Sequence, residues 1–152
     1  MVVTAKPINV DAIPAALRER RQWVCWRIVM RKGKPDKLPF QPDGIEAKSN
    51  DSSTWYSFAD VLAAYRSSGW NGIGFVFSDD DDFAGIDLDG CRDSDTGEIA
   101  EWAKSILNET SSYCEISPSG TGFKLYGIGR CMRCPVDDLR RWIDDQKKGS
   151  AK

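Results

Sequence analysis

The stretch "FAGIDLDGC", residues 83–91, decides how the second half of this chain is interpreted. It is an apolar run that ends in two carboxylates, Asp87 and Asp89. Side chains alternate between the two faces of a strand, so both carboxylates point to one face while Ile86 and Leu88 point to the other. Two like charges this close repel each other unless a cation lies between them. Three interpretations stay open: a metal site, a phosphoryl-accepting nucleophile, or an ordinary polar strand end.

The residues around this strand predict an α+β fold, in which helices alternate with antiparallel strands. Aromatic and β-branched runs predict strands, and apolar residues at helical spacing predict helices. Short turns predict two hairpins, one joining 72–78 to 83–89 and one joining 113–117 to 123–128. The expected strands are 23–30, 36–40, 72–78, 83–89, 113–117 and 123–128, and the expected helices are 11–20, 57–68, 99–110 and 135–148.

Composition limits the classes of function. The chain has 152 residues and a net charge of −2, which fits one folded domain without a global basic field that attracts nucleic acid. It contains no histidine, which excludes His-based catalytic triads and most zinc sites. We find no membrane-spanning run and no signal segment, so we expect a cytoplasmic protein without a membrane partner.

A second element, "SPSGTGFK", covers residues 117–124. Gly120 and Gly122 permit tight backbone conformations in which amide groups converge on an anion. The hydroxyl groups of Ser117, Ser119 and Thr121 add donors, and Lys124 places an ammonium group beside them. The same residues also fit an ordinary Gly-containing hairpin turn. Together with the carboxylate pair, they are the parts of a site for a divalent metal, magnesium or manganese, and a nucleotide.

Other short motifs compete with this interpretation. "DLDG" resembles the nucleophile motif of haloacid-dehalogenase-type phosphatases, with Asp87 as nucleophile and Asp89 as acid and base, but Cys91 replaces the usual hydroxyl residue. A calcium loop starting at Asp87 fails, because Cys91 and Arg92 occupy its fifth and sixth positions. Cys131 and Cys134 have the spacing of half a zinc site without a second half.

Several motifs in succession resemble one family. "RRQWVCWR", "KPDKLPF", "STWYSFADVLAAY", "NGIGFVFS", "FAGIDLDGCRDSDTGEIAEWA" and "EISPSGTGFKLYG" follow one another in this order. The succession resembles the N-terminal primase–polymerase domain of phage and plasmid replication proteins, in the archaeo-eukaryotic primase superfamily. The resemblance divides the chain into a leader with a short helix (1–20), the primase–polymerase-like domain (21–130), and a C-terminal helix and tail (131–152).

The resemblance implies an RRM-like mixed, largely antiparallel sheet flanked by helices. It implies metal-dependent DNA primer synthesis from nucleoside triphosphates on a DNA template, with a helicase region as a further partner in a full-length parent. Asp87 and Asp89 match the family's catalytic metal-binding motif. The loop residues that match its nucleotide-binding motif are Ser117, Ser119, Gly120 and Gly122, and Lys37 matches a recurring basic position.

Two departures from the family pattern bear on activity. Lys124 stands where the family usually has a histidine that reaches the triphosphate. No later strand supplies the family's third carboxylate, and Asp137 and Asp138 fall in an expected helix, so we do not assign them this role. A missing third carboxylate predicts impaired catalysis. The alternative function is a non-catalytic module that binds nucleotide or nucleic acid.

Overall fold

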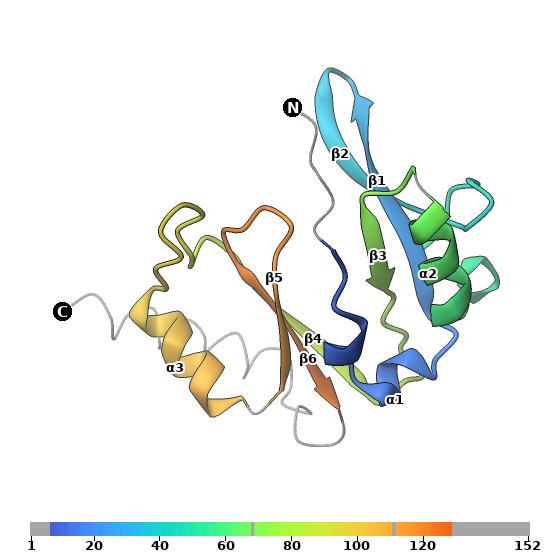
Figure 1. Cartoon of the computed structure of the whole chain (residues 1–152). Coiled ribbons are helices and arrows are strands. Elements are labelled where there is room, and N and C mark those ends of the chain that lie inside the picture. Colours follow the sequence, from blue (N-terminus) through green and yellow to red (C-terminus); the bar gives the residue numbers. More distant parts are fainter. Residues whose placement is uncertain (1–6, 68, 111, 129–152) are drawn as a thin grey trace. The chain divides into compact units, whose positions relative to one another are not determined.

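A computed structural model of the chain describes residues 7–67, 69–110 and 112–128 (Figure 1). They divide into two compact units, with the boundary between Asp79 and Asp80. Each unit contains one three-stranded sheet in which every strand pairing is antiparallel. The predicted α+β fold is confirmed, and its strands are distributed over two sheets. The predicted domain limits at residues 20 and 130 stay predictions, and the expected C-terminal helix lies outside the described residues.

Unit 1 is built around β1, the central strand of the order β2-β1-β3. The aromatic and β-branched residues of β1 favour this buried central position. Strand β2 contains Pro39 and lies at the edge, where a missing backbone N–H is tolerated. The elements of unit 1 are η1 (Val10–Ala12), α1 (Ala15–Arg18), β1 (Trp23–Arg31), β2 (Lys34–Phe40), η2 (Ser52–Thr54), α2 (Phe58–Ser67) and β3 (Gly72–Phe75).

The predicted hairpin between 72–78 and 83–89 is wrong. Strand β3 pairs with β1, whereas β4 (Phe83–Leu88) pairs with β6 (Phe123–Ile128) in the other sheet. Trp26 explains the choice of partner, because its indole Nε1–H donates to the carbonyl of Ile73 and its ring occupies the space where a Cβ on Gly72 would lie. The connection between β3 and β4 contains four consecutive aspartates, 79–82, whose charges repel one another. It contains no glycine, which a tight hairpin turn favours.

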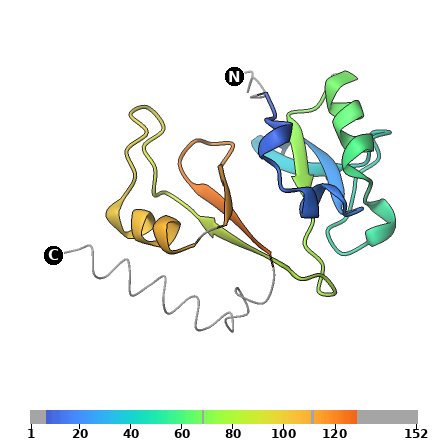
Figure 2. The same cartoon turned by 60° about the horizontal axis from the view of Figure 1, so that its bottom comes forward.

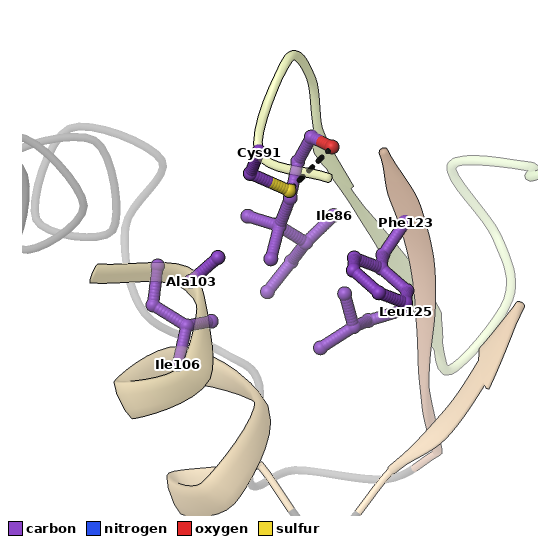
Figure 3. Packing of buried hydrophobic residues seen from close by; sticks show 7 residues of the cluster. Ile86, Cys91, Ala103, Ile106, Phe123 and Leu125 are labelled. Carbon is purple, nitrogen blue, oxygen red and sulfur yellow. Dashed lines mark hydrogen bonds between the residues drawn. The ribbon is translucent and has the colours of Figure 1, made fainter. Parts of the chain in front are cut away.

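Unit 2 contains the order β4-β6-β5, with β5 spanning Tyr113–Ile116 and α3 spanning Glu101–Glu109. The predicted hairpin of β5 and β6 around "PSGTG" is confirmed. Helix α3 covers one face of this sheet (Figure 2). Figure 3 shows the apolar cluster between them, which consists of Ile86, Leu88, Cys91, Ala103, Ile106, Phe123 and Leu125. Because strand side chains alternate, the opposite face of the sheet presents the polar residues.

Candidate functional site

The carboxylates lie on and just beyond β4, as the alternation predicts. Ile86 and Leu88 are buried in the core of unit 2, and Asp87 between them points away from it with 59% of its side chain exposed. Asp89 follows the last residue of β4 and is also exposed. Solvent-accessible carboxylates on a rigid strand end are suited to binding a hydrated cation.

Lys124 neutralises Asp87 in the structure. The antiparallel register places the two residues opposite each other on β6 and β4, and the Nζ of Lys124 donates to Oδ1 of Asp87 at 2.7 Å. Both side chains are partly exposed, so water screens the pair and its contribution to stability is at most about 1 kcal/mol. A cation that binds Asp87 therefore competes with a weak, easily opened ion pair.

The Ser/Gly loop between β5 and β6 is tightened by its own hydrogen bonds. The Gly120 N–H donates to the Ser117 carbonyl at 2.8 Å, and the Gly122 N–H donates to Ser117 Oγ at 3.0 Å. The hydroxyl groups of Ser117, Ser119 and Thr121 form a chain with separations of 3.0 and 2.8 Å. Two of the amide groups expected to meet an anion are thus engaged within the loop. The exposed hydroxyls of Ser119 and Thr121 are the groups that face solvent.

The loop lies directly against the end of β4. A Cβ added to Gly122 would lie 2.2 Å from the carbonyl oxygen of Leu88 and 3.3 Å from Cα of Asp89. Only glycine permits this approach, because the obstructing atoms belong to the backbone. The structure therefore brings the carboxylate pair and the Ser/Gly loop together, although they are far apart in the sequence.

Arg92, which the sequence analysis did not select, joins the same two segments. Its Nη1 donates to the carbonyl of Gly120 at 2.8 Å and to that of Asp93 at 3.2 Å, and its backbone N–H donates to the carbonyl of Thr121 at 3.0 Å. Arg92 thus holds the Ser/Gly loop against the segment that follows β4. A single arginine in a polar loop gives no sequence signal for this role, because the groups that it binds in the Ser/Gly loop are backbone carbonyls, those of Gly120 and Thr121.

Glu115 was also missed and lies on the polar face beside Lys124. The register pairs Glu115 with Lys124, which in turn pairs with Asp87, so the three residues form one row across the sheet. Glu115 accepts hydrogen bonds from the hydroxyl groups of Tyr113 at 2.6 Å and Tyr126 at 3.3 Å. Burial, followed by the nearby Glu115 carboxylate, raises the pKa of both phenols. The tyrosines therefore stay protonated and hold Glu115 in place.

Lys37 lies on β2 in unit 1, where its Nζ is 4.1 Å from the ring centroid of Trp26. The other candidate residues lie in unit 2. The assignment of Lys37 to nucleotide binding stays a prediction. Cys131, Cys134, Asp137 and Asp138 fall outside the described residues.

The donor atoms of the site fit a magnesium or manganese ion. Such ions are bound in proteins by one or two carboxylates, with water and substrate phosphates completing the coordination. Asp87 and Asp89 supply this number of carboxylates. Within residues 7–67, 69–110 and 112–128, no group of three or more acidic, cysteine or histidine side chains is placed to hold a metal by itself. The remaining ligands would have to come from water and a bound nucleotide.

Comparison with known proteins defines the class to which this α+β chain belongs. No family model matches the chain. The chain is 39% identical over 121 residues, 78% of its length, to a protein named DNA Primase-polymerase. This similarity over most of the chain supports a primase–polymerase domain, as the succession of motifs indicated.

The particular relative is the DNA Primase-polymerase of Nitratiruptor phage NrS-1. The matched region spans 16% of that protein. Among the described residues of the present chain, none of the helices has the length and apolar character needed to cross a membrane.

Proposed function

We propose that this chain binds a nucleoside triphosphate together with magnesium or manganese and acts in template-directed synthesis of DNA primers. The observation that carries the proposal is the contact of Gly122 with the backbone of Leu88 and Asp89, which joins the Ser/Gly loop to the carboxylate pair. The similarity to a DNA primase-polymerase supports this function over the phosphatase alternative.

Each group has a distinct role in the proposed site. Asp87 and Asp89 hold the cation, which when bound neutralises phosphate charge and orients the reacting groups. Ser119 and Thr121 donate hydrogen bonds to phosphate oxygens from a loop that its internal bonds keep rigid. Lys124 leaves Asp87 and directs its ammonium group to the phosphates as a point charge.

Binding is tested by titrating a fluorescent deoxynucleoside triphosphate in the presence of manganese. Asp87→Asn and Asp89→Asn keep the side-chain size and remove the charge, and we expect each to weaken nucleotide binding at least about tenfold, since a charge-assisted contact is lost. Asp95→Asn is the matched control, because Asp95 is an exposed aspartate of the same unit whose side chain accepts one long hydrogen bond, from Ser94 Oγ at 3.5 Å. Equal affinities for all three variants would contradict the proposed site.

Catalysis is tested separately by primer extension on a DNA template. Extension that disappears in Asp87→Asn and Asp89→Asn would support a polymerase. Nucleotide binding without extension would support the alternative of a non-catalytic nucleotide-binding module. Hydrolysis of a phosphomonoester would instead favour the phosphatase interpretation.

A further inference from the structure

The β1–β2 hairpin between Arg27 and Lys37, here called the basic hairpin, extends beyond the rest of its sheet. Strand β3 pairs only with residues 23–26 of β1, whereas residues 28–31 pair with β2 alone. Figure 1 shows the turn of this hairpin beyond the end of β3. All residues from Met30 to Lys37 are exposed. This end of the hairpin is therefore available to a partner on both faces.

The basic hairpin has a charge opposite to that of the chain as a whole. It carries five cationic side chains and one anionic one, a net charge of +4, in a chain of net charge −2. The cations are Arg27, Arg31, Lys32, Lys34 and Lys37, and the anion is Asp36. Arg31 forms an ion pair with Glu46 at 3.2 Å, but among the described residues Lys32 and Lys34 take part in no ion pair. A local positive field of this kind attracts a polyanion.

The turn of the basic hairpin has a lysine, Lys32, at a position whose left-handed backbone conformation favours other residue types. Lys32 has a φ of 51° and Gly33 a φ of 75°, the left-handed pair of a two-residue hairpin turn. Asparagine is preferred at the first of these positions, and Lys32 is the only non-glycine residue with positive φ among those described. The strained position places positive charge at the outermost point of the hairpin, which points to a role in binding.

One face of the hairpin adds apolar surface beside the charge. Ile28 and Met30 project from the same face of β1, with 36% and 68% exposure. The register places Lys37 opposite Ile28, and its ammonium group lies over Trp26. The bases of a single strand are open to contact beside its phosphates, so an apolar strip next to cations can contact both parts of such a strand.

We propose that the basic hairpin binds the phosphate backbone of a single DNA strand, with Ile28 and Met30 against its bases. The inference rests on the proposed function in one respect, since it identifies this strand with the template. It assigns DNA binding to unit 1, whereas the metal and nucleotide residues Asp87 and Asp89 lie in unit 2.

The test measures binding of a fluorescein-labelled single-stranded oligonucleotide of mixed sequence over a series of salt concentrations. The variant Lys32→Asn/Lys34→Gln removes two charges, and the asparagine suits the left-handed turn, so the fold is preserved. The matched control is Lys48→Gln/Lys104→Gln, which removes two charges from exposed or partly exposed positions outside the hairpin. Thermal unfolding of both variants verifies that they fold.

We expect the hairpin variant to reduce the slope of log affinity against log salt concentration by about 1.4, since each phosphate contact on a single strand contributes about 0.7. The control should keep the wild-type slope. Met30→Ser should weaken binding at every salt concentration without changing the slope. An equal reduction of the salt slope in the hairpin variant and in the control would overturn the proposal. So would polyglutamate displacing the oligonucleotide as effectively as unlabelled DNA.

The two proposals fail in different ways. Asp87→Asn should leave oligonucleotide binding unchanged, and Lys32→Asn/Lys34→Gln should leave manganese and nucleotide binding unchanged. An unchanged salt slope in a protein that still binds nucleotide would refute only the role of the hairpin. A protein whose hairpin still binds DNA but which shows no manganese-dependent nucleotide binding would refute only the proposed function.

Discussion

Substitution of Gly122 by alanine tests the physical link between the two halves of the candidate site. The new Cβ would lie 2.2 Å from the carbonyl oxygen of Leu88, whereas a carbon–oxygen contact in proteins normally measures about 3.3 Å or more. The backbone would have to separate by about 1 Å. Two hydrogen bonds from the segment after β4 hold the loop against it: Arg92 N–H to the Thr121 carbonyl and Arg92 Nη1 to the Gly120 carbonyl.

Each of these bonds contributes about 1 kcal/mol, so their loss destabilises unit 2 by about 2 kcal/mol. For a unit of this size the melting temperature should fall by about 8–16 °C. Thermal unfolding followed by circular dichroism measures this fall, and nucleotide titration at low temperature should show weakened binding by the displaced loop. Gly74→Ala is the control, because the nearest atom to its Cβ would be 3.8 Å away. A Gly122→Ala protein that melts like the control and binds nucleotide normally would refute the reasoning.

Three further predictions follow from contacts of the same site. Lys124→Met frees Asp87 from its ion pair, so manganese affinity measured without nucleotide should rise by up to about fivefold, while nucleotide affinity falls; a fall in both would contradict a competing ammonium group. Arg92→Gln should weaken nucleotide binding about three- to tenfold through displacement of the Ser/Gly loop, and Arg92→Lys should restore part of the affinity. Equal nucleotide affinities of the wild type and both variants would exclude a positioning role for Arg92. Burial and Glu115 raise the pKa of Tyr113 and Tyr126 above the usual value of 10.0. The stability that these two protonated phenols contribute is therefore complete below about pH 10, and it is lost as the pH rises through their folded-state pKa. A phenolate absorbance titration should show two late-titrating tyrosines, and ordinary titration of all tyrosines would contradict the burial of this pair.

Local patterns predicted most of the secondary structure because the determining interactions lie close in the sequence. Alternation in 83–89 correctly placed Asp87 opposite the core, and the glycines of 117–122 correctly predicted the turn between β5 and β6. The helix expected at 57–68 corresponds to α2, and it begins directly after Ser57, whose Oγ accepts from the Asp60 N–H at 3.2 Å. In each case the pattern reflects a contact within a few residues.

Strand partners and cross-strand contacts were not predictable in the same way. The choice of β1 as the partner of β3 depends on the indole of Trp26, which is nearly fifty residues away in the sequence. The ion pair of Asp87 with Lys124 depends on the register of β4 against β6, and a shift by one residue would place Lys124 on the other face. Arg92 acts through backbone carbonyls, which have no residue-specific signature. Strand partners and cross-strand contacts therefore depend on long-range register, which local sequence patterns do not predict.

Manganese-dependent binding of a deoxynucleoside triphosphate by the wild-type chain and by Asp87→Asn/Asp89→Asn tests the central claim most directly. Our account predicts that manganese strengthens nucleotide binding to the wild type, that this gain disappears in the double variant, and that Asp95→Asn retains it. Nucleotide affinity that is the same with and without manganese, or the same in the wild type and the double variant, would contradict the assignment of Asp87 and Asp89 to a metal and nucleotide site.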